Sequence, residues 1–251
     1  MNKKEKRISR ILELLKENGR MRVADLARLL DVTPETLRTD LTGLAASHLV
    51  EREHGQVRLI NRGWEEEPYI VRNTRNVPQK YAASYAALSK VKDGQVIYVD
   101  GGTTVMQGLE ALRGKKDLTV VTNSLTGAMI LSDMDINTIM VGGTISNQNK
   151  YAYGAFTTLV LDHIQFDTVF ISTDGFKDCG GFTTRSEMDM ETKRQLMART
   201  ECLVVISDSS KFGFRAAFRY CSFREVDALY TNRLSDEQRE QVQAVRQIIE
   251  I

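Results

Sequence analysis

The stretch VTPETLRTDL, residues 32–41, contains the start signal of a helix and determines how the N-terminal part of the chain is interpreted. Thr33 can cap a helix whose first residue is Pro34, because proline suits the first helical position and has no amide hydrogen that needs a partner. Leucines then recur at i, i+4 and i+7, as Leu37, Leu41 and Leu44. One stripe of this helix must therefore be buried.

The opposite face of the helix is polar, and it carries Glu35, Thr36, Arg38, Thr39 and Thr42. A polar face of this kind is usually only solvated. Two helical patterns precede it, however, over residues 5–18 and, in a shorter form, over residues 26–30. Only Asp31 and Val32 separate the shorter helix from Thr33, and two short helices joined by a tight turn form a helix-turn-helix. The second helix of such a motif can enter the DNA major groove.

The segment LVEREHGQVRLI, residues 49–60, alternates apolar and polar residues around His54 and Gly55, which is a hairpin signal. A hairpin behind a helix-turn-helix is a winged arrangement. Residues 1–62 contain 13 Lys and Arg against 9 Asp and Glu, a net charge of +4, while the rest of the chain has 21 against 24, or −3. The N-terminal unit is therefore the basic one, and phosphate contacts need cations. A charge of this size fits a specific dimeric binder better than a protein that coats DNA.

We therefore predict that double-stranded operator DNA contacts the turn, the second helix and the hairpin. Thr36 and Arg38 are expected to face base edges, and neighbouring amides to face phosphates. The predicted DNA-binding residues are Arg22, Thr33, Pro34, Glu35, Thr36, Arg38, Thr39, Arg52 and His54. One winged unit buries little DNA surface, so recognition of paired half-sites also predicts a homo-oligomer, a dimer or larger, joined through its C-terminal domain.

The length of 251 residues and the hydrophobic content of 42% are enough for more than one core. We expect a winged helix-turn-helix domain over residues 1–62, a solvated linker over 63–76 and a second domain over 77–251. No apolar run approaches the ~18 residues of a membrane span and the basic N-terminus lacks a signal-peptide core, so we expect a cytoplasmic protein without a membrane partner. The three cysteines and three histidines have neither metal-ligand nor nucleophile spacing, so no metal and no cofactor is expected.

The second domain shows short apolar runs among helical patterns. The runs are QVIYVD, LTVVT, NTIMV, DTVFIS, CLVVIS and DALYT, and the helical stretches are VPQKYAASYAALSKV, TVMQGLEAL, SLTGAMIL and ETKRQLMART. Near-continuous apolar runs are typical of strands that are buried on both faces of a parallel sheet. The pattern predicts a doubly wound, mostly parallel α/β domain.

Ligands of doubly wound sheets bind at the carboxyl ends of the strands, where this sequence repeatedly places small and polar residues. The first strand runs into GGTT, residues 101–104, where glycines allow close approach and free amides at a helix start favour an anion. The strand CLVVIS leads to DSSKFG, in which Lys211 could reach an anion from the neighbouring strand end. We predict a polar cleft for a small phosphorylated ligand. Its expected residues are Asp100, Gly101, Gly102, Thr103, Thr104, Asn123, Ser124, Gly143, Asp174, Lys193 and Lys211.

Two sets of motifs resemble the DeoR family of bacterial transcriptional regulators. The first set, RISRILELLKENG, VADLARLLDVTPETLRTDLTGL and LVEREHG, resembles its DNA-binding domain, except that Thr39 replaces the second of two successive arginines usual in the family. The second set, VDGGTT, VTNSL, VGG, TDGF, GFTTRSEMDMETKR and DSSKFG, resembles its sensor domain. The resemblance implies an oligomeric repressor of sugar-catabolism genes, whose sensor is related in fold to ribose-5-phosphate isomerase and binds a sugar phosphate.

The kinship with an isomerase leaves an enzyme with a DNA-binding head as the alternative. Aldose–ketose isomerisation needs a carboxylate base, and Asp174 stands at a suitable strand end. The isomerase motif has a Glu where this chain has Thr192, however, and Glu191 is about 100° further round the helix. Cys179 also stands where a cation is expected. We therefore expect a binding site without catalytic groups and not an enzyme; the sequence leaves open whether Glu191 and Lys193 only form a solvated helix face.

Overall fold

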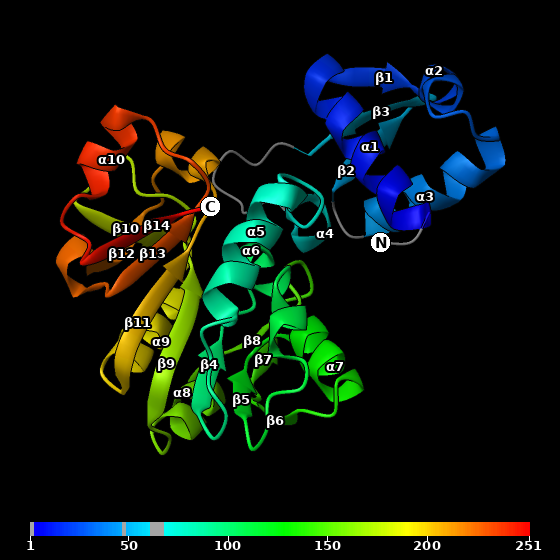
Figure 1. Cartoon of the computed structure of the whole chain (residues 1–251). Helices are drawn as coiled ribbons and strands as arrows, with labels where there is room; N and C mark the ends of the chain where they lie inside the picture. Colours follow the sequence, from blue (N-terminus) through cyan, green and yellow to red (C-terminus); the bar gives the residue numbers. More distant parts are fainter. Residues whose placement is uncertain (1–2, 47–48, 61–67) are drawn as a thin grey trace. The chain divides into compact units, whose positions relative to one another are not determined.

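The computed structural model describes residues 3–46, 49–60 and 68–251. The chain divides into two compact units, Met1–Arg75 and Asn76–Ile251 (Figure 1). Each unit has its own hydrophobic core. The expected fold class is confirmed, since a helix-turn-helix unit is followed by an α/β unit with a parallel sheet. Among the helices within the described residues, none has the length and apolar character needed to cross a lipid bilayer.

The first unit contains a winged helix-turn-helix. Its helices are α1 (Lys3–Asn18), α2 (Val23–Leu29) and α3 (Pro34–Ala46), and its strands are β1 (Arg20–Arg22), β2 (Val50–Glu53) and β3 (Gln56–Leu59). The strands pair antiparallel in the order β1-β3-β2. The hairpin turns at His54 and Gly55, whose φ values of 48° and 76° suit a type I′ turn. Strand β1 was not predicted, because three residues, RMR, are too few to establish an alternating pattern.

The segment predicted as a solvated linker, residues 63–76, is partly folded. Residues 63–67 lie outside the described residues. Helix α4 (Tyr69–Arg72) follows, and its Val71 is only 5% exposed in the core of the first unit. The hydroxyl of Thr74 is hydrogen-bonded to that of Ser9 in α1. Burial of the apolar Val71 side chain explains the difference, because it stabilises a turn that polar neighbours alone would leave in water.

The second unit is built on a seven-stranded parallel sheet with the order β14-β13-β11-β9-β4-β5-β6. The strands are β4 (Val96–Val99), β5 (Thr119–Thr122), β6 (Asn137–Met140), β9 (Phe166–Ser172), β11 (Thr200–Ile206), β13 (Ala228–Thr231) and β14 (Gln247–Glu250). All but β14 were predicted; its run, QIIE, holds only two apolar residues. Strand β4 pairs with β5 on one side and β9 on the other, so the topological switch point lies between β4 and β9.

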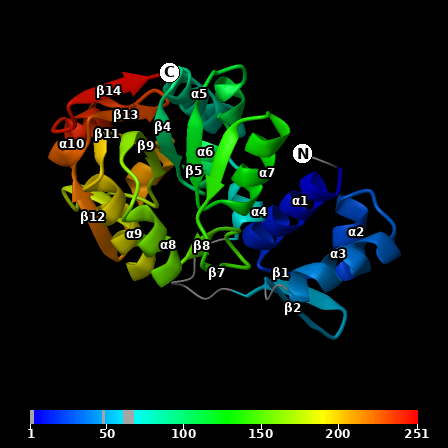
Figure 2. The same ribbon diagram turned by 90° about the horizontal axis from the view of Figure 1, so that it is seen from below.

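Helices cover both faces of this sheet. Val120 belongs to the core that includes residues of α5 (Val77–Leu88), α6 (Thr103–Met106) and α7 (Leu125–Asp133). The next residue, Val121, belongs to the core that includes residues of α8 (Ala155–Leu161), α9 (Glu187–Met197) and α10 (Asp236–Val242). Successive strand residues point to opposite faces, so these two cores lie on opposite sides of the sheet. Figure 2 shows α5 and α7 on one side and α8 and α9 on the other.

One predicted helical stretch, TVMQGLEAL, is interrupted. Helix α6 ends at Met106, and a 3₁₀ helix, η1 (Leu109–Leu112), follows it. Gly108 stands at the break, where a Cβ atom would lie 2.5 Å from the backbone of Ser84 in α5. The chain therefore passes α5 too closely for a side chain at this position.

Two small antiparallel ribbons complete the unit, and neither was predicted. They are β7 (Thr144–Ile145) with β8 (Ala152–Tyr153), and β10 (Gly181–Thr184) with β12 (Phe218–Ser222). Two short 3₁₀ helices, η2 (Ser209–Gly213) and η3 (Phe223–Glu225), flank β12. Ribbon β10–β12 adds Phe182 and Tyr220 to the core on the side of α9.

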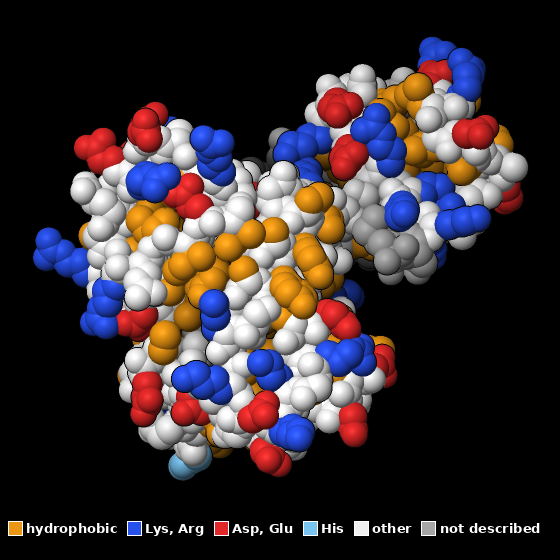
Figure 3. Space-filling view, viewed as in Figure 1, with side chains coloured by type: hydrophobic (Ala, Val, Ile, Leu, Met, Phe, Trp, Pro, Cys, Tyr) orange, Lys and Arg blue, Asp and Glu red, His pale blue; other side chains and the backbone are white. Residues whose placement is uncertain are grey.

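Strand β6 was predicted to be buried on both faces, and this prediction was wrong. It lies at one end of the strand order, and Ile139 and Met140 are 39% and 41% exposed. An apolar run gives no information on whether a strand is central or at an edge. A second exposed apolar area lies over α5 and the nearby C-terminal strands (Figure 3). There Tyr81 and Tyr85 stack with ring centroids 5.4 Å apart.

Candidate DNA-binding surface and effector site

Helix α3 is held in the first unit by the predicted apolar stripe and cap. Leu37, Leu41 and Leu44 are all buried in the core of this unit. The hydroxyl of Thr33 accepts a hydrogen bond from the amide of Thr36 at 3.2 Å, as an N-cap residue does. The stripe sets the rotation of the helix, so the opposite face is turned to the solvent.

A buried ion pair, which the sequence analysis missed, also fixes α3. Asp40 is only 2% exposed, and its carboxylate accepts hydrogen bonds from Arg7 of α1 at 2.5 Å and 3.2 Å. The hydrogen bond with Asp40 raises the pKa of Arg7. A signal was present in the sequence, since an Asp next to Leu41 and three residues after Leu37 falls on the buried side of the helix.

Hydrogen bonds run along the outward face of α3, and one of them connects this face to the hairpin formed by β2 and β3. Arg38 pairs with Glu35 at 3.2 Å, and Thr39 donates to the Glu35 carbonyl at 3.1 Å. Thr42 donates to the Arg38 carbonyl at 2.8 Å, and Arg52 of β2 donates to the Thr42 hydroxyl at 3.2 Å. The exposed Arg38–Glu35 pair contributes little to stability, so Arg38 can exchange Glu35 for a group on DNA.

The remaining predicted DNA-binding residues lie on the same unit. Pro34 starts α3 and is exposed. Arg22 ends β1, opposite Gln56 of β3, and His54 forms the hairpin turn; both side chains are exposed. Of all nine predicted residues, only Thr36 is partly buried. The unit therefore presents one helix face and one hairpin tip, both with exposed cations.

The predicted effector residues gather first at the switch point of the sheet. Asp100 follows β4, and its Oδ2 accepts hydrogen bonds from the amide and the hydroxyl of Ser172 on β9, at 3.0 Å and 2.6 Å. A Cβ atom on Gly102 would lie 2.0 Å from the Ser172 hydroxyl, so only glycine fits there. Thr103 and Thr104 then begin α6, and each is 4% exposed.

Lys80, which was not among the predicted site residues, reaches this loop from α5. Its side chain is 4% exposed, and its Nζ donates to the hydroxyl of Thr103 at 3.2 Å. An ammonium group so deeply buried needs polar or anionic partners, because transfer of a charge out of water is unfavourable. A signal existed, since Lys80 lies on the apolar side of the helix, in register with Ala83, Ser84 and Ala87.

Two other predicted residues hold the loops of the site. Asn123, after β5, accepts a hydrogen bond from the amide of Gly101 at 3.1 Å. The hydroxyl of Ser124 accepts from the amide of Gly127 at 3.0 Å and so caps α7. Gly143 has a φ of 140°, and a Cβ atom there would lie 2.5 Å from the carbonyl oxygen of Tyr153. The structure therefore gives these three residues roles in loop packing.

Lys193 lies in a buried charge network, so it does not belong to a solvated helix face. It is 4% exposed, with its Nζ 2.7 Å from Asp189 and 3.9 Å from Asp100. The ammonium also lies 5.1 Å from the ring centre of Tyr220. Burial alone would lower the pKa of Lys193, but Asp189 and Asp100 outweigh it and raise the pKa well above its ordinary value. Lys193 is therefore a fixed positive charge behind the switch point.

The same network extends to Asp174, the predicted site residue after β9. Thr184 donates to Asp189 at 2.5 Å and lies 3.3 Å from Asp174, which also accepts from the amide of Arg185 at 3.0 Å. Glu191, in contrast, is exposed, while Thr192 is buried and donates to a carbonyl of its own helix. The position where an isomerase base was expected thus holds a hydroxyl.

The end of β11 brings a further carboxylate, Asp208, which is 2% exposed. Its Oδ1 accepts from the side chain of Asn76 at 2.9 Å and from Ser210. Its Oδ2 is buried and has no hydrogen-bond partner among the described residues. Lys211 stands three residues later on η2 and is partly buried. Asp208 belonged to the DSSKFG motif but was not among the predicted site residues.

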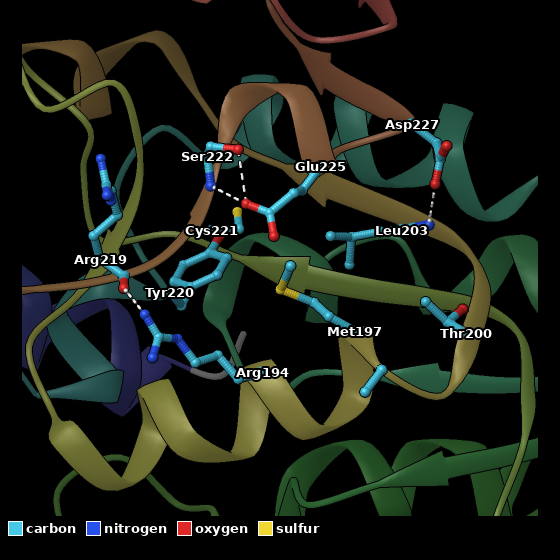
Figure 4. A pocket seen from close by; sticks show the side chains of 11 residues that line it. Arg194, Met197, Thr200, Leu203, Arg219, Tyr220, Cys221, Ser222, Glu225 and Asp227 are labelled. Atoms are coloured by element: carbon cyan, nitrogen blue, oxygen red, sulfur yellow. Dashed lines mark hydrogen bonds between the residues drawn. The ribbon is translucent and has the colours of Figure 1, made fainter.

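A pocket of about 570 Å³ lies elsewhere on the unit, between α9 and β12 (Figure 4). Arg194 donates to the carbonyl of Arg219 at one end, and Glu225 lies between these arginines and Leu203. Hydrogen bonds from Ser222 lower the pKa of Glu225, and both arginines act in the same direction. The pocket contains none of the predicted effector residues, and its lining is mixed in charge, with Arg194 and Arg219 beside Glu225 and Asp227.

Comparisons with known proteins match both units. Residues 75–233 match the family model described as the DeoR C terminal sensor domain, and residues 7–62 match the DeoR-like helix-turn-helix domain. The HTH-type transcriptional regulator GolR of Listeria innocua is 30% identical over 227 residues, which are 90% of this chain and 89% of the relative. The Glycerol-3-phosphate regulon repressor of Escherichia coli is 26% identical over 235 residues, 92% of this chain and 91% of the relative.

Among solved structures, a ribose 5-phosphate isomerase A from Neisseria gonorrhoeae is a weak match. It is 19% identical, with a TM-score of 0.41 over 55% of this chain and 54% of that chain, too low to support any conclusion about function. The sequence relatives and the family models, in contrast, span both units. With its winged helix-turn-helix and its parallel sensor sheet, the chain belongs to the DeoR family and is a DNA-binding transcriptional regulator.

Proposed function

We propose that this regulator acts in the cytoplasm as an oligomeric repressor of carbohydrate-catabolism genes and that a phosphorylated sugar bound at the switch point relieves repression. The observation that carries the proposal is the buried Lys80 ammonium against Thr103, beside the glycine loop that follows β4. The name of one relative, the Glycerol-3-phosphate regulon repressor, is consistent with a small phosphorylated effector.

The phosphate of the ligand is assigned to the loop of residues 101–104. Lys80 supplies a cation, two threonines supply hydroxyls, and the glycines allow backbone amides to approach an anion closely. Lys211 is the second cation, from the short helix after β11. This combination of charge and donors suits a phosphate ester better than a neutral sugar.

The sugar hydroxyls are assigned to the carboxylates at the strand ends. Asp100 and Asp174 can each accept hydrogen bonds from hydroxyl groups, and Asp208 has one buried oxygen without a partner among the described residues. Lys193 lies 3.9 Å from the Asp100 carboxylate and offsets part of the negative charge at this end of the sheet. Which sugar fits depends on the placement of these acceptors around the hydroxyl stereocentres.

A thermal-stability screen with phosphorylated sugars tests the proposal. A ligand present at 100 times its Kd should stabilise the protein by about 2.7 kcal/mol, and the same sugar without its phosphate should have no such effect. Operator affinity should fall roughly 5- to 150-fold with the active compound, the range of common allosteric coupling energies. If no phosphorylated sugar raised the melting temperature, the effector assignment would be wrong.

The alternative function is a sugar-phosphate isomerase attached to a DNA-binding unit. We propose that the chain is not an enzyme, because Thr192 and the exposed Glu191 leave the switch point without the expected base. Ribose 5-phosphate and the sugar that stabilises the protein best should both be recovered unchanged after long incubation. Formation of the ketose at a rate that rises with protein concentration would instead establish the enzyme.

Arg38→Ala is expected to weaken operator binding about 5- to 150-fold, since a good contact to a base edge contributes ~1–3 kcal/mol. The exposed pair with Glu35 contributes little, so the melting temperature should stay within about one degree. Gel-shift titrations at fixed salt measure the affinity. The matched control is Arg28→Ala on α2, which removes another exposed arginine that pairs only weakly with Asp25 at 3.7 Å. Equal affinities of the Arg38 variant and the wild type would contradict the assignment.

A further inference from the structure

The exposed hydrophobic residues of the second unit are concentrated in one part of the chain. Fourteen large hydrophobic residues are exposed within the described part of the protein, and eight of them lie between residues 129 and 160. These eight are Met129, Ile130, Ile139, Met140, Ile145, Phe156, Leu159 and Val160. The most exposed are Phe156 at 73% and Met129 at 70%. Scattered exposed residues need no explanation, but a concentration of this kind marks an interaction surface.

These residues surround one edge of the sheet. Strand β6 is the last strand in the order, and α7 packs against it. Leu131 of α7 belongs to the core on one face of the sheet, and Leu161 of α8 belongs to the core on the other face. Two helices with exposed apolar residues therefore lie on opposite faces of the sheet, toward the end that β6 closes. We name α7, β6 and α8 together the β6 edge surface.

The β6 edge surface is also unusually poor in charge. The chain as a whole is 27% charged, but residues 125–161, which include all three elements, contain only three charged residues, Asp133, Asp135 and Lys150. Exposed edge strands of soluble monomers are normally protected by charged side chains, by proline or by a covering element. Strand β6, with the sequence NTIM, has neither a charged residue nor a proline. Depletion of charge with retention of Met, Phe and aliphatic residues is the composition of an interface core.

We propose that the β6 edge surface is the interface between two copies of this chain. The inference rests on the proposed oligomeric regulator and assigns its dimer contact. A free edge strand is self-complementary: about a twofold axis, β6 can pair antiparallel with β6 of the second copy and continue the sheet. Helix α7 then packs on the partner's α7 across one face, and α8 on the partner's α8 across the other.

The size and chemistry of the surface favour a second copy over a foreign protein. The seven exposed large side chains on α7, β6 and α8 are 38–73% exposed and together offer roughly several hundred Å² of apolar area. A standard interface buries about 800 Å² on each partner. With almost no charge, the surface lacks the complementary potential that would orient an unrelated partner. A symmetric pair of sensor units also presents two DNA-binding units, as paired half-sites require.

Sedimentation of the full-length protein tests the interface. The wild type should be a dimer or larger, and Met129→Arg with Phe156→Arg should raise the dissociation constant at least about 30-fold, as loss of an interface hot spot does. Both side chains are at least 70% exposed, so the substitutions should not disturb the fold of the single subunit. The monomeric variant should therefore keep the melting temperature of the wild type. The matched control is Tyr85→Arg on the exposed face of α5, which should remain dimeric.

Three results would overturn the proposal: a monomeric wild type, unchanged self-association of the double variant, or dissociation caused by the Tyr85 control. If the double variant does not fold, amide hydrogen exchange of the wild type tests the interface instead. Protection of the amides of residues 137–140 should rise with protein concentration. Protection that stays constant as the concentration rises would overturn the proposal. A monomeric variant should still be stabilised by the phosphorylated sugar. This readout separates failure of the interface from failure of the effector site.

Discussion

Replacing Lys80 with methionine is expected to weaken binding of the phosphorylated sugar roughly 10- to 150-fold, because a hydrogen bond to a charged group contributes about 1.5–3 kcal/mol. Methionine retains an apolar side chain of similar length, so it fills the space of the lysine stem without leaving a cavity. Operator affinity in the absence of ligand should stay within about twofold. In cells this variant would repress its target genes but would no longer respond to the inducer.

Thermal shift and operator binding, each measured with and without the sugar phosphate, check this expectation. Lys90→Met is the matched control, since this lysine follows the same helix but is exposed. Thr103→Ala with Thr104→Ala should reproduce the loss of response in part, because it removes two hydroxyls and keeps the cation. A Lys80→Met variant that is stabilised by wild-type ligand concentrations would refute the phosphate assignment.

Removal of Arg7 is expected to have the largest effect on stability. Arg7→Met leaves the Asp40 carboxylate buried without its partner, and breaking a buried pair in this way costs about 3–5 kcal/mol. Arg7 itself keeps 22% of its side chain exposed, so some water can enter and the loss should lie at or just below the lower limit of that range, roughly 2–3 kcal/mol. Because Asp40 anchors the DNA-binding helix to α1, operator affinity should also fall.

The reverse change tests the asymmetry of this pair. Asp40→Leu leaves an arginine that can still reach water, so it should destabilise less than Arg7→Met. The double variant Arg7→Met with Asp40→Leu should recover much of the stability, since an apolar pair can replace a buried ion pair. Denaturant unfolding of the wild type, the two single variants and the double variant gives the free energies of a double-mutant cycle. Equal losses from the two single variants would show that the pair behaves as a surface interaction.

The hydrophobic pattern of the sequence was sufficient to predict the two units and six of the seven sheet strands, because runs such as VIYV in β4 are continuously apolar. It failed where the outcome depends on neighbours in space. The run at β6 is as apolar as a central strand, and only the strand order reveals that Ile139 and Met140 have no neighbouring strand on one side. Pattern likewise gave β14 no signal, because its two isoleucines stand between polar residues, with Arg246 and Gln247 before them and Glu250 after them.

The effector site was predicted from strand ends, and the structure places Asp100 and the loop of residues 101–104 between β4 and α6. Lys80 was not predicted as a site residue because it lies on a helix, more than twenty residues before the loop that it contacts. The role of Lys193 could not be decided from the sequence, because a lysine near Glu191 and Arg194 on a helix is typical of a solvent-exposed helix face. Its burial depends on the positions of Asp100 and Asp189, which the folded chain brings together.

The hydrogen bond between Asn76 and Asp208 links this site to the point where the chain leaves the first unit. Asn76 directly follows Arg75, the last residue of that unit, and it has a left-handed φ of 52°. Its side chain is held by Asp208 at 2.9 Å, and its carbonyl by the amide of Lys80 at 2.9 Å. Because Asp208 holds the side chain of Asn76 and the backbone of Lys80 holds its carbonyl, the first residue of the second unit is fixed by two residues of the proposed effector site.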